Sequence, residues 1–143
     1  MDRPTADLTR FAAELDAGDL PGAVRTLAGQ HVLDVLAGQL AGAGTPEART
    51  VTRLFGPDPA DCAAVFAMTA HAAESDPIHA ATTICAGMVA VPPALCLARD
   101  GATAAAAVVA GYEVAIRIGT ALRSARLLGQ GWWPTAVCGG AGA

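Results

Sequence analysis

The chain has 143 residues, enough for one domain, and 53% of them are hydrophobic while only 4% are aromatic. Its apolar residues are mostly Ala, Val and Leu, which argues against an all-β protein and favours an all-α helical bundle. A net charge of −4, with nine scattered arginines and no lysine, argues against a nucleic-acid-binding protein.

Two helices are predicted in the first third of the chain. Apolar residues at helical spacing between Leu8 and Leu15 predict a helix that begins near Pro4 and ends before Gly18. A second helix is predicted from Pro21 to the glycines at positions 42 and 44. Its long apolar stripe is typical of the central helix of a bundle. The residues of that stripe are Val24, Leu27, Val32, Val35, Leu36 and Leu40.

Local start and stop signals mark the next two helices. Thr45 followed by Pro46 and Glu47 predicts a capped third helix, which Gly56 and Pro57 end. Asp58 and Pro59 open a fourth helix that runs to about Ala73. The segment 74–83 then reads as a loop, because Pro77 breaks the helical pattern.

The second half predicts three more helical segments. The apolar segment 86–98 is expected to be kinked or interrupted at Pro92 and Pro93. After a turn at 99–101, Thr103 is expected to cap one long helix over 104–128. Residues 132–143 resemble the opening of a further buried helix that is cut short. Since the chain shows no internal repeat and no linker, residues 1–143 are predicted to form a single domain.

The surface of this domain is predicted to be short of charge. Charged residues make up 15% of the chain, against a usual value of about 25%, and a small domain exposes much of its surface. We therefore expect another chain to cover part of it, in a homo-oligomer or a hetero-oligomer. A monomer with an alanine-rich surface is the alternative.

The spacing of the cysteines and the hydropathy of the chain indicate its cellular compartment. No CxxC pair and no zinc-finger spacing occurs, so we expect reduced, buried cysteines in a cytoplasmic protein. The uncharged stretch 77–98 is long enough to span a membrane, but His79 and the proline pair inside it favour a buried helix. No membrane association is therefore expected. The cysteines are Cys62, Cys85, Cys96 and Cys138.

The densest group of ionisable residues lies around the predicted loop. His71, Glu74, Asp76 and His79 fall within nine positions of a chain that has few charges. Carboxylates beside imidazoles can supply a general acid and a general base. The alternative is an ordinary solvated loop that needs polar residues. No metal site is expected, because His71 and His79 are eight residues apart.

Several segments, in order along the chain, resemble the MmgE/PrpD family. The strongest match is the segment from Ala110 to Gly119, which is similar to a family signature. The others are Asp19-Leu20-Pro21, His31-Val32-Leu33-Asp34, Ala70-His71-Ala72 with its acid-rich loop, Val91-Pro92 and Gly131-Trp132-Trp133-Pro134-Thr135-Ala136-Val137.

The resemblance implies lyase chemistry on small carboxylates, as in 2-methylcitrate dehydratase and cis-aconitate decarboxylase, without a metal or organic cofactor. It also implies a helical domain joined to a second α+β domain, usually in a homodimer. The matched region corresponds to the first part of the helical domain. Within the loop, Glu74, Asp76 and His79 agree with the family pattern, whereas Cys85 and Trp133 stand where the family has histidines.

The resemblance thus leads to one main hypothesis and one alternative. In the main hypothesis the chain is a lyase component of dehydratase or decarboxylase type, which acts on a small carboxylate-like molecule at a site completed by another chain. In the alternative it is a non-catalytic, degenerate partner or oligomerisation subunit of a longer family-like chain. The expected catalytic residues are His79, Asp76 and Glu74, and the expected substrate-binding residues are His71, Cys85, Trp132, Trp133 and Thr135.

Overall fold

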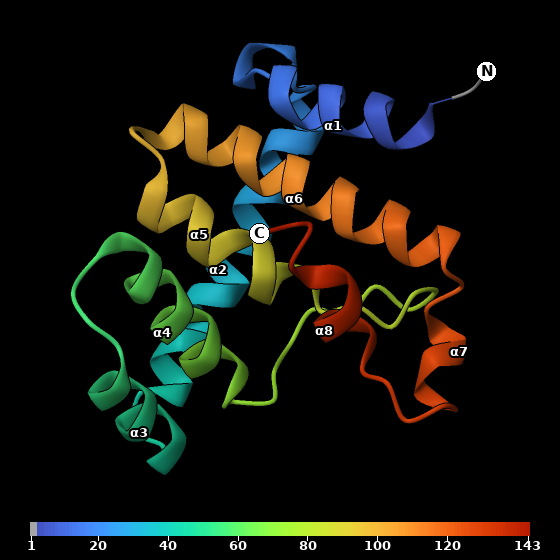
Figure 1. The fold of residues 1–143 in the computed structure, drawn as a ribbon. Coiled ribbons are helices and arrows are strands. Elements are labelled where there is room, and N and C mark those ends of the chain that lie inside the picture. The colour runs from blue at the N-terminus through green and yellow to red at the C-terminus, as the bar shows by residue number, and fades with distance from the viewer. Residues whose placement is uncertain (1–2) are drawn as a thin grey trace.

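The computed structural model describes residues 3–143, and this part of the chain is all helical (Figure 1). It contains eight α-helices and one short 3₁₀ segment, and no strand, which confirms the predicted all-α bundle. The elements are α1 (Pro4–Glu14), η1 (Ala17–Asp19), α2 (Gly22–Gly42), α3 (Pro46–Leu54), α4 (Pro59–His71), α5 (Ala86–Leu97), α6 (Gly101–Ala121), α7 (Ala125–Leu128) and α8 (Pro134–Gly139).

Side-chain caps fix the starts of three helices. The Thr45 hydroxyl accepts the Ala48 amide at α3, and the Asp58 carboxylate accepts two amides at α4, as the local sequence predicted. The predicted cap at Thr103 is wrong: Asp100 caps α6 by accepting the Thr103 amide at 2.8 Å. The helix therefore begins earlier than predicted, at Gly101.

The predicted long helix over 104–128 is also wrong, because α6 ends at Ala121. Arg123 adopts a left-handed backbone conformation with φ of 51°, and the short helix α7 follows separately. Ser124, in the break, is buried, and its hydroxyl donates to the Thr82 carbonyl at 2.7 Å. This contact between distant segments accompanies a break, although residues 120–128 contain no glycine or proline.

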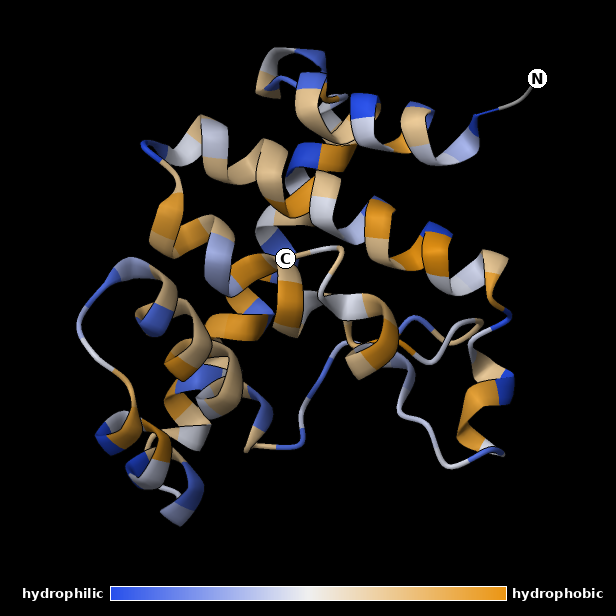
Figure 2. Cartoon of the chain, in the orientation of Figure 1, coloured by the Kyte–Doolittle hydropathy of each residue, from blue (hydrophilic) through white to orange (hydrophobic). Residues whose placement is uncertain are grey.

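Helix α5 is the centre of the bundle and packs against α4 and α6 (Figure 1). It runs through Pro92 and Pro93, so of the predicted kink or interruption, the interruption is wrong. Figure 2 shows apolar residues along its whole length, whereas hydrophilic residues gather on α1 and α3. Val91 in α5 is completely buried, and so are Val35 of α2 and Ala70 of α4.

Helix α2 is apolar on two sides, and only one of them is covered. Its buried residues are Ala28, Val35, Gly38 and Gly42. A Cβ at Gly42 would overlap the Thr69 carbonyl oxygen, so this glycine lets the backbones of α2 and α4 approach closely. The predicted central stripe is therefore only partly right, since several of its leucines are exposed. These are Leu27 at 53%, Leu36 at 37% and Leu40 at 80%, with Leu33 at 68% beside them.

One helix of the described chain, α6, is long and apolar enough to cross a membrane by length and composition alone. The core helix of a soluble protein passes the same test. The stretch that raised this question in the sequence, 77–98, consists of a loop followed by the twelve-residue helix α5.

Candidate functional site

The candidate site is built around the loop that joins α4 to α5. Glu74 and Thr83 have left-handed backbone conformations, with φ of 51° and 55°, where the chain reverses direction. The His79 amide donates to the Ile84 carbonyl at 2.9 Å and closes a tight turn. The loop ends where the buried Cys85 amide donates to the Thr135 hydroxyl of α8 at 3.0 Å. Residues far apart in the sequence therefore hold it in place.

An imidazole and a carboxylate contact each other where α4 meets this loop. The Nδ1 atom of His71, the last residue of α4, contacts the Oδ2 atom of Asp76. The Asp76 side chain is only 7% exposed and that of His71 28%. Burial raises the pKa of Asp76, and the opposing effect of His71 is smaller. The second oxygen of Asp76, Oδ1, is buried without a hydrogen-bond partner in the described part of the chain.

An indole ring covers the imidazole. The rings of His71 and Trp133 stack with centroids 4.9 Å apart and planes inclined by 11°. Trp133 is itself 44% exposed, so this side of the pair faces solvent. A negative carboxylate on one side and the electron-rich indole face on the other can both stabilise a positive charge on the imidazole.

Cys85 is buried close to this pair. Burial raises the pKa of its thiol, the hydrogen bond with Thr135 opposes this, and the negative charges of Asp76 and Glu74 raise it further. Cys85 is therefore held as a neutral thiol. All four cysteines are free, but the expectation that all are buried is wrong, because Cys62 is exposed and Cys96 only partly buried.

Five of the eight residues predicted for the site come together here: His71, Asp76, Cys85, Trp133 and Thr135. Glu74 is exposed, but its charge acts on Asp76. Trp132 is 62% exposed. His79 faces elsewhere: its Nδ1 atom lies 2.8 Å from the Thr82 hydroxyl, and the ring lines a separate cavity.

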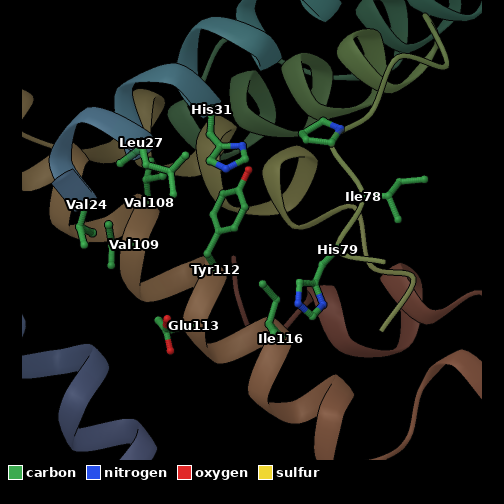
Figure 3. Close-up of a pocket in the computed structure, with 12 residues that line it drawn as sticks. Val24, Leu27, His31, Ile78, His79, Val108, Val109, Tyr112, Glu113 and Ile116 are labelled. Atoms are coloured by element: carbon green, nitrogen blue, oxygen red, sulfur yellow. The ribbon is translucent and has the colours of Figure 1, made fainter. Parts of the chain in front are cut away.

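That cavity has a volume of about 380 Å³ and lies between α2, α6 and the loop (Figure 3). The rings of His31 and Tyr112 face each other at its side, with centroids 4.9 Å apart. Neither residue was among those predicted for a site. A usable signal was present, since Tyr112 is the single tyrosine of the chain and lies in an otherwise apolar helical segment.

Neither the family models, the curated proteins nor the solved structures contain a match to this chain. Within residues 3–143, no group of three or more His, Cys, Asp or Glu side chains is arranged to hold a metal ion.

Proposed function

We propose that this chain is a component of an MmgE/PrpD-like lyase that removes water or carbon dioxide from a small carboxylate without a cofactor. The observation that carries the proposal is the shielded His71–Asp76 pair, stacked under the partly exposed Trp133. The sequence resemblance supplies the reaction class, and the pair supplies a group suited to proton transfer.

In this proposal His71 is the base. Asp76 contacts Nδ1 and so favours the tautomer with the proton there, which leaves the lone pair on Nε2. In a dehydration, Nε2 takes a proton from the carbon beside the carboxylate, and that electron pair forms the double bond. Hydroxide leaves from the neighbouring carbon as that C–O bond breaks, and the proton held on Nε2 passes to it, so water is the product and the neutral imidazole is restored. Asp76 and Trp133 stabilise the intermediate imidazolium.

The substrate carboxylate requires positive charge that the described cluster does not contain. No arginine within residues 3–143 forms an ion pair with His71, Asp76 or Cys85; the arginines that do form ion pairs, Arg10 and Arg117, use their own neighbours on α1 and α6. Arginine or lysine from another chain would have to hold the substrate. The proposed enzyme is therefore an assembly, either of copies of this chain or with a longer family-like chain.

Hydrogen exchange at carbon tests the proposal directly. The purified chain, alone and mixed with the product of any neighbouring family-like gene, is incubated in D₂O with a panel of small hydroxy-acids. Deuterium uptake beside the carboxylate and alkene formation are followed by NMR. We expect His71→Gln and Asp76→Asn to reduce both rates by at least about 100-fold, and His79→Ala to leave them within about threefold. Equal losses in all three variants would assign proton transfer to the loop as a whole.

The second candidate function is a non-catalytic partner, and the exposed face of α2 favours it. Leu33, Leu36 and Leu40 follow one another at helical spacing and are all exposed. A partner that binds there would lose affinity in Leu40→Asp, and His71→Gln would leave the activity of the complex unchanged. Light scattering of the wild-type chain and of Leu40→Asp, with and without the longer chain, tests whether this face binds the partner. The activity of the complex that contains His71→Gln then distinguishes the two functions.

A further inference from the structure

The outer face of α2 is apolar, and nothing within residues 3–143 covers it. Leu33 is 68% exposed, Leu36 37% and Leu40 80%, and helical spacing puts all three on one side of the helix. Asp34 is the only charged residue between Leu33 and Leu40. Its negative charge raises the pKa of Tyr112 in α6, so Asp34 lies on the flank of α2 that is turned toward α6. The outer face itself is therefore left without a charge.

One turn before Leu33, the same face contains Gly29, a glycine that no contact in the described chain explains. A glycine inside a helix destabilises it relative to alanine. Gly38 and Gly42 have a reason to be glycine, because a Cβ there would press against backbone carbonyls of α4. A Cβ at Gly29 would meet nothing within 4 Å, and the residue is exposed. Gly29 is thus a notch in an open apolar face, where the side chain of another helix can approach closely.

The two ends of this face carry opposite charge. Figure 1 shows α1 and α3 at opposite ends of α2. At the α1 end, residues 15–25 contain two acids, the exposed Asp16 and Asp19, and one arginine, a net charge of −1. At the α3 end, residues 43–54 contain two arginines and one acid, a net charge of +1. These arginines, Arg49 and Arg53, line a hollow of about 360 Å³ together with Ala43, and neither forms an ion pair within residues 3–143.

We propose that the outer face of α2 pairs with the same face of a second copy of this chain, with the two helices antiparallel about a two-fold axis. In this arrangement Leu40, the most exposed of the three leucines, fills the notch at Gly29 of the partner subunit. The acidic end of each α2 then lies beside the arginines of the other, whereas a parallel pair would place like charges together. Each end of the face supplies what the other end lacks, which favours a second copy over other occupants. The proposal goes beyond the proposed reaction and does not depend on His71.

A pair of glycine variants tests whether the notch is used. Sedimentation velocity of the purified wild-type chain should show a reversible monomer–dimer equilibrium with a Kd of about 1–50 µM, because one helix pair buries less than a standard interface. Gly29→Leu should raise this Kd at least about 30-fold, since its side chain fills the notch. Gly101→Leu adds the same side chain at another open glycine, at the start of α6, and should change the Kd less than about twofold. Circular dichroism checks that both monomers are folded.

Charge reversal tests the antiparallel direction and the identity of the occupant. Asp19→Arg and Arg53→Asp should each weaken the dimer about tenfold. The variant with both substitutions should return to within about threefold of wild type, because each new arginine again meets a new acid across the two-fold axis.

Four results would overturn the proposal. These are a wild-type chain that stays monomeric up to about 500 µM, equal effects of the two glycine variants, additive losses in the double charge variant, and a monomer that binds the longer family-like chain through the face that contains Gly29. The last result would assign the face to that chain. None of these results bears on proton transfer by His71, which the deuterium-uptake measurement tests separately.

Discussion

The α4–α5 loop contributes to two regions that differ in how their polar groups are satisfied. On one side, Asp76 pairs with His71 in a shielded setting against Trp133. On the other side, only three residues further along, His79 lines a mostly apolar cavity, and beside it the buried Tyr112 hydroxyl has no partner within residues 3–143. The first region thus holds its buried carboxylate against an imidazole, whereas the second leaves a buried hydroxyl without a partner within the described residues. Proximity in the sequence is therefore a poor guide to membership of one site.

The comparison predicts that polar groups contribute to stability in the first region and cost stability in the second. The largest effect is expected for His71→Ala, which leaves the shielded carboxylate of Asp76 unpaired and removes the stack on Trp133. We expect the free energy of unfolding at neutral pH to fall by about 2–3 kcal/mol. Urea denaturation measures this. The matched control is His79→Ala, with a loss below about 1 kcal/mol; an equal loss would mean that the two regions do not differ.

The next largest effect concerns the anchor of the loop. Ser124→Ala removes the buried hydrogen bond to the Thr82 carbonyl and should cost about 1 kcal/mol. It should also accelerate amide hydrogen exchange at Thr82 and Thr83. Thr120→Ala removes an exposed hydroxyl that bonds only within α6 and serves as the control. Faster exchange in both variants would show that Ser124 has no special role.

A smaller effect is expected on the pH dependence of stability, through Asp76. Because the pKa of Asp76 is raised above its ordinary value in the folded chain, this carboxyl favours folding most at pH below that ordinary value. The advantage is lost as pH rises through the folded pKa. Asp76→Asn cannot ionise, so its stability relative to wild type should increase from about pH 3 to about pH 7. Denaturation of both proteins across this range tests the sign, and a relative decrease would show that pairing with His71 outweighs burial.

The smallest effect on stability is expected for Tyr112, beside the cavity. Tyr112→Phe removes a buried hydroxyl without a partner, so we expect stability to stay within about 0.5 kcal/mol of wild type or to rise slightly. Thermal unfolding measures it. Val108→Ala, which empties volume beside the same ring, is the contrasting variant and should cost more than about 1 kcal/mol. A clear loss in Tyr112→Phe would reveal a structural partner for the hydroxyl.

The sequence predicted those features that depend on neighbouring residues. Thr45 and Asp58 act as caps because each side chain reaches an amide at most three residues away. The end of α6 at Ala121 was missed because the break after it contains Ser124, whose partner Thr82 is 42 residues away. The cap of α6 was assigned to Thr103 and not to Asp100, because both residue types fit a cap and spacing alone does not choose between them.

The candidate site also combines features that neighbouring residues predict with features that only the fold produces. Spacing grouped the four ionisable residues around the loop, but it gave no means of pairing Asp76 with His71 rather than with His79. The stack of Trp133 on His71 joins residues that are far apart in the sequence, and only the fold brings them together. Tyr112 was missed because a tyrosine in an apolar helix usually packs in the core. The cavity beside it follows from the arrangement of α2 and α6.

The two anchors of the loop have a consequence for synthesis on the ribosome. Ser124 holds Thr82, and Thr135 holds Cys85, so residues 74–85 depend on partners that are translated 42 and 50 residues later. Helices α2, α3 and α4 can already pack while those partners are still inside the exit tunnel. Until then, the loop that contains Asp76 and Cys85 lacks both of these hydrogen bonds. During this interval the loop is open to a chaperone or a protease, and it reaches its final conformation only after Ser124 and Thr135 have emerged.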